Sequence, residues 1–354
     1  MRGINSSDSS LKVVVQPSDR ETALLFDQFG FQPISTVPQL LYYPIHELHL
    51  DRQQSQLTNL FTALGLQIPA SAQAACRYVV TQASLDTQTV LVEFLNAQPL
   101  NTIIQYGWFD QVLMQQNLAI YYQPIVELNS KRVVAYECLA RTANGKTGQQ
   151  LIEAALATNR MTEFDRLART TCIREIAAYR NGLHQFFINV LPNAIAQDPQ
   201  SIEENFQQVL DLGLRPDQIV FELIEVEAIK HNPNLPQFID RIRALGFGLA
   251  IDDLCSNVRL DHYCTEFRPD VIKLDRRLIH GCSQYALKQI MIKSLLQAAH
   301  EIGIAVLAEG LETQSDIEFC CEIGVDLGQG FGLGAPEMAP CSISSLNPCC
   351  IEAC

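Results

Sequence analysis

Basic residues, long apolar runs and paired metal-binding cysteines are all scarce in this chain of 354 residues. Lys and Arg number 25 against 39 Asp and Glu, which gives a formal net charge of −14. A surface that binds duplex nucleic acid needs clustered cations to replace counterions, so this function is not expected. No segment approaches the roughly 18 apolar residues of a membrane-spanning helix. The polar start MRGINSSDSS lacks the apolar core of a secretory signal, so we expect a cytoplasmic protein.

The twelve cysteines show no CxxC or Cys/His spacing typical of a metal site. In a cytosolic chain of this length most are expected to be small buried apolar residues. Four of them crowd the last fourteen positions, and we expect residues 341–354 to form a loose Cys-rich tail whose role the sequence does not reveal.

The N-terminal part predicts a small α/β domain over residues 11–115, preceded by ten disordered residues. Short β-branched runs predict strands and amphipathic runs predict helices. No glycine-rich phosphate loop or cofactor motif is present, so a regulatory role is expected, with a signal and a partner that the sequence does not identify. The predicted strands are 11–16, 39–45, 76–82 and 90–95, and the predicted helices are 20–30, 55–65 and 100–116.

Residues 116–340 show a regular alternation of short apolar strands with longer helical segments. Such alternation is typical of a mostly parallel α/β sheet, and the number of strands favours a closed, TIM-type (β/α)8 barrel. The first two strands are joined by a short segment that allows an antiparallel hairpin. A helix over 283–302 is expected to turn one face inward, made up of Leu287, Ile290, Met291, Leu295 and Ala298. The predicted strands are 118–128, 133–141, 186–192, 219–225, 248–253, 271–275, 305–310 and 328–333.

Polar side chains recur at the ends of these predicted strands. In a barrel these ends converge on one rim, where active sites lie. Taken singly, an acidic residue after a strand is usually a helix cap or a solvated loop group. The set as a whole is harder to explain by packing: Glu137, Arg141, Asn189, Glu222, Glu225, Asp252, Asp253, Lys273, Asp275, Glu309, Glu312 and Gln329.

Carboxylates gathered on one rim raise one another's pKa unless cations are present. Carboxylate and amide oxygens are hard ligands that suit Mg²⁺ or Mn²⁺. Two such ions can stabilise both oxygens of an in-line displacement at phosphorus. Lys273 lies within a strand, where an unpaired charge is costly to bury. It therefore needs a carboxylate, a phosphate or a reacting water, and a purely structural salt bridge is the alternative.

The order of these residues resembles the EAL family of cyclic di-GMP phosphodiesterases over about 118–340. The name-giving motif reads Glu137-Cys138-Leu139 here, and the upstream Gln-Pro-Ile begins at Gln123. The remaining motifs are FINVLP with Asn189, FELIE with Glu222 and Glu225, Asp252-Asp253, Ile272-Lys273-Leu274-Asp275, AEGLE with Glu309 and Glu312, and Gln329-Gly330 followed by Pro336.

The resemblance implies hydrolysis of cyclic di-GMP to linear pGpG in bacterial signalling, with a TIM-type barrel and two divalent cations, Mg²⁺ or Mn²⁺. It assigns Lys273 to orienting the attacking water, with Glu225 and Glu312 as supporting groups of the catalytic site. Gln123, Arg141 and Gln329 would bind the dinucleotide. The implied metal ligands are Glu137, Asn189, Glu222, Asp252, Asp253 and Glu309. Family members are often dimeric, and a homodimer is left open here.

The chain departs from the family after the paired aspartates. The family usually reads Asp-Asp-Phe-Gly-Thr-Gly, whereas residues 252–257 read DDLCSN. Glycine permits backbone conformations that Cys resists, so this loop bears on activity and dimerisation. The alternatives to an active enzyme are a barrel that binds cyclic di-GMP as a receptor and a protein-interaction module. Retention of Lys273 favours the enzyme, because binding alone does not require it.

Overall fold

The computed structural model describes residues 10–46, 50–224, 234–252 and 267–340. The chain divides into two compact units. The first comprises Met1–Gln116 with Glu153–Asn159, and the second comprises Asn117–Ile152 with Arg160–Cys354. Each unit has its own apolar core.

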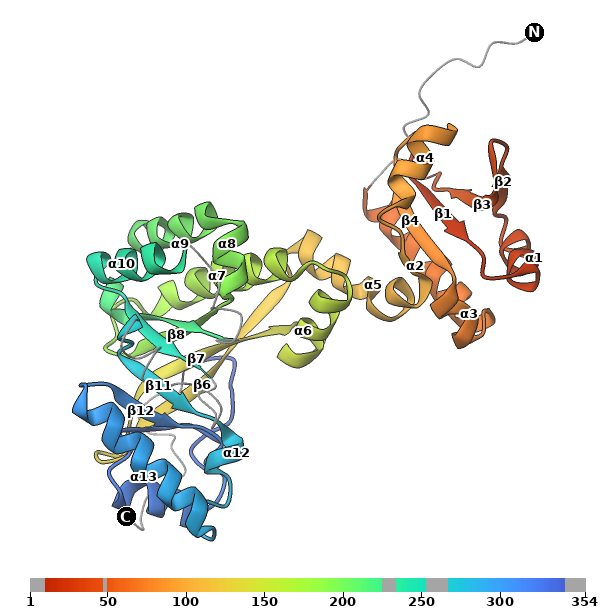
Figure 1. The fold of residues 1–354 in the computed structure, drawn as a ribbon. Coiled ribbons are helices and arrows are strands. Elements are labelled where there is room, and N and C mark those ends of the chain that lie inside the picture. Colours follow the sequence, from red (N-terminus) through yellow and green to blue (C-terminus); the bar gives the residue numbers. More distant parts are fainter. Residues whose placement is uncertain (1–9, 47–49, 225–233, 253–266, 341–354) are drawn as a thin grey trace. The chain divides into compact units, whose positions relative to one another are not determined.

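The first unit is built on an antiparallel sheet with the strand order β2-β3-β1-β4-β5 (Figure 1). Helix α1 begins where the carboxylate of Asp19 accepts a hydrogen bond from the Thr22 amide. The predicted α/β character of this region is confirmed. The elements are β1 (Lys12–Gln16), α1 (Arg20–Gln28), β2 (Gln32–Ile34), β3 (Val37–Pro44), α2 (Leu50–Gln67), α3 (Ala70–Ala75), β4 (Arg77–Thr81), α4 (Thr87–Phe94), β5 (Gln98–Pro99) and α5 (Leu100–Gln115).

One predicted strand of this unit is wrong. The run VLVEFL at 90–95 lies mostly in helix α4. Asp86 caps this helix by accepting the Thr89 amide at 3.0 Å, and Val90 is buried while Leu91 and Val92 are exposed. The run therefore forms part of a helix that buries one face, because the helix cap outweighs the β-propensity of the two valines.

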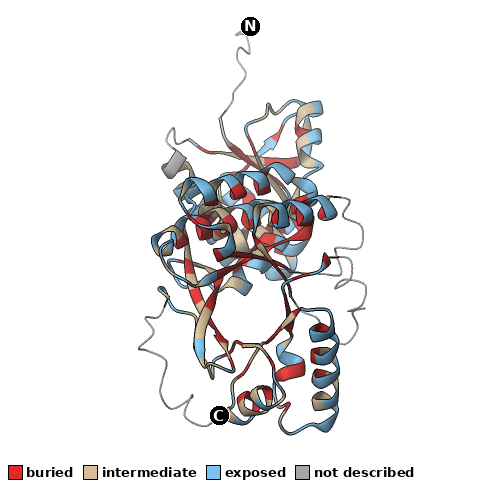
Figure 2. Cartoon of the chain, turned by 90° about the vertical axis from the view of Figure 1, so that its left-hand side faces the viewer, coloured by how far each residue is buried: buried red, intermediate tan, exposed pale blue. Residues whose placement is uncertain are grey.

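The second unit is a closed barrel with the strand order β10-β11-β12-β13-β6-β7-β8-β9. The strands form a ring in Figure 2, and the helices outside it turn their buried faces inward. Strand β6 is antiparallel to both β7 and β13, which confirms the predicted hairpin, and the other pairs are parallel. The strands are β6 (Leu118–Glu127), β7 (Arg132–Thr142), β8 (Gln185–Val190), β9 (Ile219–Leu223), β10 (Gly248–Ile251), β11 (Val271–Leu274), β12 (Ala305–Ala308) and β13 (Leu327–Gly328).

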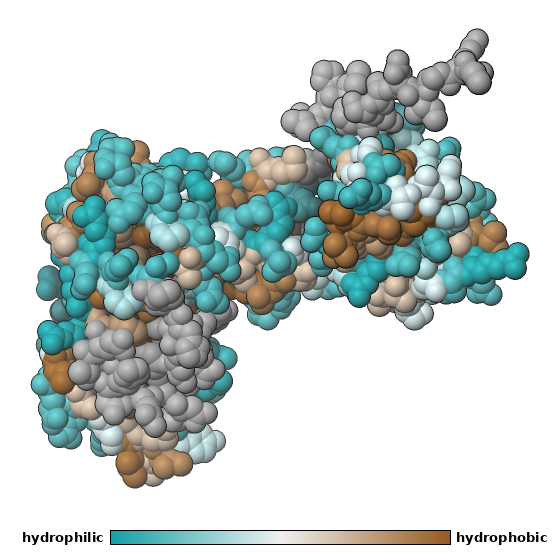
Figure 3. Space-filling model, turned by 45° about the horizontal axis from the view of Figure 1, so that its top comes forward, coloured by the Kyte–Doolittle hydropathy of each residue, from teal (hydrophilic) through white to brown (hydrophobic). Residues whose placement is uncertain are grey.

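The buried face of helix α13 was predicted correctly only in part. Met291 and Leu295 pack against the core as predicted, whereas Leu287 and Ile290 are 70% and 63% exposed and Ala298 is exposed. The fully buried residues of the helix are Ile292, Leu296 and Ala299. Among the described residues, no helix is long and apolar enough to span a bilayer. The face of the molecule in Figure 3 is largely hydrophilic. Helix α6 (Gly148–Ala157) begins in this unit, and its residues from Glu153 onward belong to the first unit. The other helices of this unit are α7 (Met161–Ile176), α8 (Pro192–Gln197), α9 (Pro199–Asp211), α10 (Leu235–Leu245), α12 (Arg276–Ile279), α13 (Ala286–Glu301) and α14 (Gln314–Glu322).

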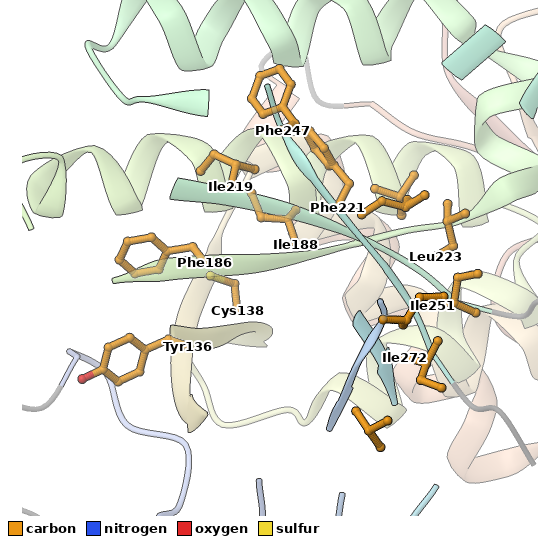
Figure 4. Close-up of a cluster of buried hydrophobic side chains, with 14 of the residues drawn as sticks. Tyr136, Cys138, Phe186, Ile188, Ile219, Phe221, Leu223, Phe247, Ile251 and Ile272 are labelled. Atoms are coloured by element: carbon orange, nitrogen blue, oxygen red, sulfur yellow. The ribbon is translucent and has the colours of Figure 1, made fainter. Parts of the chain in front are cut away.

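Two apolar layers hold the barrel together, one on each side of the strands. Side chains such as Tyr136, Ile188 and Phe221 point outward and pack against the helices (Figure 4). Their neighbours along the same strands, such as Phe187 and Val220, fill the barrel interior. Because side chains alternate across a strand, each strand contributes to both layers. The interior is thus a packed core, as in other barrels of this kind.

Candidate functional site

Each strand of the barrel places one polar side chain immediately above an apolar floor. The floor consists of Ile125, Ala135, Phe187, Val220, Ala250, Val271, Leu307 and Leu327. Two residues further toward the rim, each strand or its direct continuation carries one polar residue. We call these eight the polar ring: Gln123, Glu137, Asn189, Glu222, Asp252, Lys273, Glu309 and Gln329. All eight were predicted as site residues from the sequence.

Lys273 on β11 lies at the centre of the carboxylates of the polar ring. Its Nζ is 2.6 Å from Glu222 Oε1 and 2.7 Å from Glu309 Oε1. The nearest oxygens of Glu137 and Asp252 are 3.5 Å and 3.7 Å away. The side chain is 1% exposed. The structure therefore gives this buried ammonium the partners that its position in a strand demands.

Two amides hold Glu137 in place. Gln329 Nε2 donates to its Oε2 at 2.7 Å, and Asn189 Nδ2 donates to its Oε1 at 3.3 Å. Three buried oxygens of the polar ring accept no hydrogen bond within the described part of the chain: Asn189 Oδ1, Glu222 Oε2 and Gln329 Oε1. A buried acceptor without a partner is unfavourable, so these oxygens are available as ligands.

The pKa values of the cluster reflect an excess of negative charge. Four carboxylates surround one ammonium, a formal surplus of three negative charges. Burial and the neighbouring carboxylates raise the pKa of Glu222 well above its ordinary value and that of Glu309 to about 7. Burial also acts to raise the pKa of Glu137, but Lys273 and the two amide donors outweigh it and lower the value. The surrounding carboxylates raise the pKa of Lys273 against the effect of burial, so it remains charged.

The donors of the polar ring fit a hard divalent cation. Its possible ligand atoms are carboxylate and amide oxygens, which such cations prefer. Two of the buried oxygens that accept no hydrogen bond belong to Asn189 and Glu222, and the side chains around Lys273 carry a formal excess of negative charge. In the arrangement described, the carboxylates converge on the Lys273 ammonium. No three Asp, Glu, His or Cys side chains of the described residues enclose an ion site by themselves. Cation binding would therefore require carboxylates to turn from Lys273 toward the ion.

A cleft of about 430 Å³ opens above one side of the polar ring. It is lined by Gln123, Glu137, Glu309 and Gln329, and also by residues beyond the ring. Glu312, predicted as a supporting catalytic residue, lies in this cleft and forms an ion pair with Arg276 at 2.9 Å instead of contacting Lys273. Arg276 and Phe331 were not predicted as site residues. The only sequence signal for them is their position directly after Asp275 and Gln329-Gly330.

The remaining predicted residues lie outside this cluster. Arg141 lines a second, mainly apolar cavity of about 130 Å³ between β7 and helices α6 and α7, which Asn189 of the polar ring also lines, and it donates to the Ala140 carbonyl at 2.8 Å. Asp275 caps α12 by accepting the Arg277 amide, which is the ordinary role of an acidic residue after a strand. Glu225 and Asp253 lie outside the described residues.

The closed ring of strands, with acidic and amide side chains at one rim and a lysine among them, defines a TIM-type barrel with an oxygen-rich site for cations. Residues 108–336 match the model of the EAL domain, and the chain belongs to this family. The predicted fold and the resemblance found from the motifs are both confirmed.

Several proteins are similar in sequence to part of this chain. The chain is 28% identical over 231 residues to an uncharacterized protein of Azorhizobium caulinodans, and 28% identical over 236 residues to the cyclic di-GMP phosphodiesterase PdeB of Shewanella oneidensis. These matches cover 61% and 64% of this chain, but they span only 31% and 27% of the two relatives.

Solved structures extend the similarity in fold. A standalone EAL protein of Vibrio cholerae in a cyclic di-GMP-bound form matches with a TM-score of 0.58 at 26% identity, over 67% of this chain and 98% of that one. Klebsiella pneumoniae BlrP1 in a calcium and cyclic di-GMP complex matches with a TM-score of 0.59 at 21% identity. The second match covers 94% of this chain and 98% of that one, so the likeness in fold reaches into the N-terminal unit.

Proposed function

We propose that the chain hydrolyses one phosphodiester bond of cyclic di-GMP to give linear pGpG, with divalent cations in the polar ring. The observation that carries the proposal is the convergence of four carboxylates on Lys273 above an apolar floor. A relative that is 28% identical over 236 residues is named a cyclic di-GMP phosphodiesterase, and a similar barrel is known with cyclic di-GMP bound.

Two Mg²⁺ or Mn²⁺ ions are proposed, held by Glu137, Asn189, Glu222, Asp252 and Glu309, with Asp253 as a further ligand. Such ions neutralise phosphate charge and lower the pKa of a coordinated water. The surplus negative charge of the ring makes it a favourable site for these cations and an unfavourable one for a bare phosphodiester.

Lys273 would donate a hydrogen bond during the reaction and would not act as a general base. In the arrangement described, the surrounding carboxylates raise the pKa of Lys273, so its ammonium is charged. If the carboxylates held cations, Lys273 would orient the attacking water through its Nζ protons. Gln123 and Gln329 lie along the cleft and can bind the sugar, base or phosphate oxygens of the dinucleotide. Arg141 is proposed to contact the dinucleotide on the other side of the rim.

The direct test incubates the purified full chain with cyclic di-GMP and Mg²⁺ or Mn²⁺ and separates the products by chromatography. The expected result is pGpG that disappears when a chelator is added. The Glu137→Gln variant, which keeps the shape of the side chain, should form none. Binding of cyclic di-GMP without any product would contradict hydrolysis and identify a receptor.

The rest of the chain is assigned by the same proposal. Residues 116–340 would form the catalytic barrel, and residues 11–115 would form a domain that regulates it. The protein would be cytoplasmic. Native mass spectrometry of the full chain tests for a retained small molecule and for a homodimer in one measurement.

A further inference from the structure

Helix α7 carries a buried ion pair that takes no part in the chemistry proposed above. Asp165 and Arg169, one turn apart on this helix, form the pair, and their side chains are 5% and 0% exposed. Replacing a buried ion pair by uncharged residues of similar size is often neutral or even stabilising. Stability alone therefore does not explain why two charges lie in the apolar layer between strands and helices.

Arg169 is held in place from helix α9. Its Nε donates to Asn205 Oδ1 at 2.8 Å, and its Nη2 donates to Ser201 Oγ at 3.0 Å, with both bonds buried. A guanidinium presents its donors in a rigid plane, so two fixed partners determine its orientation. The ion pair then fixes the carboxylate of Asp165.

The carboxylate of Asp165 holds the end of strand β8. Its Oδ1 accepts a hydrogen bond from the Leu191 amide at 3.0 Å in a buried position. Leu191 directly follows β8 and lies two residues after Asn189. The paired residues of β7 and β8 end at Cys138 and Ile188, whereas those of β8 and β9 continue to the end of the strand. Asp165 thus fixes the backbone where the pairing with β7 has stopped.

Asn189 is the residue of the polar ring that depends on this end of β8. Its Nδ2 donates to Glu137 Oε1 at 3.3 Å, and its buried Oδ1 accepts no hydrogen bond from the described residues. A cation tolerates deviations of only about 0.2 Å in its ligand distances. A small displacement of the strand end is therefore sufficient to spoil the site.

We propose that Asp165, oriented by Arg169, is a positioning residue that holds the end of β8 so that Asn189 Oδ1 can bind a cation, an inference that rests on the proposed function. Neither charged side chain touches the cation or the substrate. Residues that orient metal ligands in this way contribute about 10- to 100-fold to metal affinity.

Two double variants separate this role from that of a simple tie between helices. One combines Asp165→Leu with Arg169→Gln, and the other combines Asp165→Asn with Arg169→Gln. Both remove the two charges together, so neither leaves an unpaired buried charge. Glutamine Nε2 occupies the same place along the side chain as arginine Nε and can still donate to Asn205. Only the second variant keeps an acceptor for the Leu191 amide.

The first measurement is the dissociation constant of Mn²⁺ for the full chain without nucleotide, by titration calorimetry. The Leu-containing variant should bind Mn²⁺ about 10- to 100-fold more weakly than the wild type, and the Asn-containing variant should bind it as the wild type does. The control variant is Arg166→Gln with Glu204→Gln. It removes an exposed ion pair of 2.8 Å between the same two helices and should leave the affinity unchanged.

The second measurement is amide hydrogen exchange in a chelator, which reports on the strand end without any metal. Exchange of the Leu191 amide should be about 5-fold faster in the Leu-containing variant, as expected for the loss of one hydrogen bond, and unchanged in the Asn-containing one. If the Leu-containing variant does not fold, Asp165→Glu takes its place. This change keeps both charges but moves the carboxylate by one methylene, so it should also weaken Mn²⁺ binding.

Equal Mn²⁺ affinities of the two double variants would overturn the inference, whether both are lowered or both are unchanged, because the acceptor for the amide would then not matter. Wild-type affinity in Asp165→Glu would overturn it as well. A wild-type chain that binds Mn²⁺ but cleaves no cyclic di-GMP refutes the proposed hydrolysis alone, and the Mn²⁺ affinities still decide the inference. A wild-type chain that binds no Mn²⁺ refutes the cation site and the inference with it.

Discussion

Replacement of Lys273 by Met tests whether this ammonium stands in for cations in the polar ring. Met retains most of the aliphatic stem and removes the charge. Four carboxylates then face one another, two of them formerly within 2.7 Å of Nζ. Removing one partner from a buried ion pair destabilises a protein by about 3–5 kcal/mol. Uptake of protons by Glu222 and Glu309, whose pKa values are already raised, will keep the loss toward the lower end of this range.

In a barrel of this size each kcal/mol changes the melting temperature by roughly 2–4 °C. We therefore expect Lys273→Met to melt about 6–12 °C below the wild type in the presence of a chelator. Saturating Mn²⁺ should remove most of this difference, because bound cations neutralise the same carboxylates. Differential scanning fluorimetry at neutral pH, with and without Mn²⁺, measures both values. Turnover should fall by orders of magnitude in either case, because the donor to the attacking water is lost.

Lys293→Met provides the matched control, since Lys293 is exposed on α13 and its ammonium lies over the ring of Phe319, which is not part of the polar ring. Its melting temperature should stay within about 2 °C of the wild type in both buffers. The reasoning is refuted if Lys273→Met melts like the wild type in chelator, or if Mn²⁺ leaves the difference unchanged.

Three further substitutions test other parts of the structure. Glu137→Gln should abolish turnover and leave the fold intact; residual activity near that of the wild type would contradict its role as a ligand. Gly310→Ala forces a Cβ against the Arg276 stem and should raise KM for cyclic di-GMP, whereas Gly324→Ala, also at positive φ but with no atom within 4 Å of the added Cβ, should only lower stability. Burial acts to raise the pKa of Asp316, but hydrogen bonds from Ser283, Thr313 and Gly281 outweigh it and lower the pKa from 3.8 to about 2. Its stabilising effect is therefore present above about pH 4 and is lost as pH falls toward 2. Asp316→Asn should remove about 2 kcal/mol from the free energy of unfolding at pH 7 and little at pH 2, as urea titration would show.

The sequence predicted the polar ring because two independent regularities coincide there. Strand residues alternate between the helices and the barrel interior, and parallel strands present their carboxyl ends at one rim. A polar residue at an inward position of a buried strand, such as Glu222 or Lys273, is therefore visible as an exception in an apolar run. The resemblance in motif order then assigned roles that position alone could not.

The sequence could not predict features that depend on packing between elements. The valines at 90–92 favour a strand locally, and only the cap at Asp86 and the burial of Val90 show a helix. The face of α13 that packs on the barrel differs from the predicted one by about one residue, since several apolar positions of that helix are exposed. Arg276 begins the short helix α12 and Phe331 follows β13, and both reach the cleft only because the ring of strands closes.

The alternation between floor, polar ring and helix layer makes the barrel intolerant of a change in strand register. Inserting or deleting one residue within β9 would turn Glu222 toward the helices and bring Phe221 or Leu223 into the interior. A charge would then face an apolar layer, and a large apolar side chain would enter the space of the site. We therefore expect this barrel to tolerate insertions and deletions only in the loops between strands, where they can change the shape of the cleft without moving a residue of the polar ring.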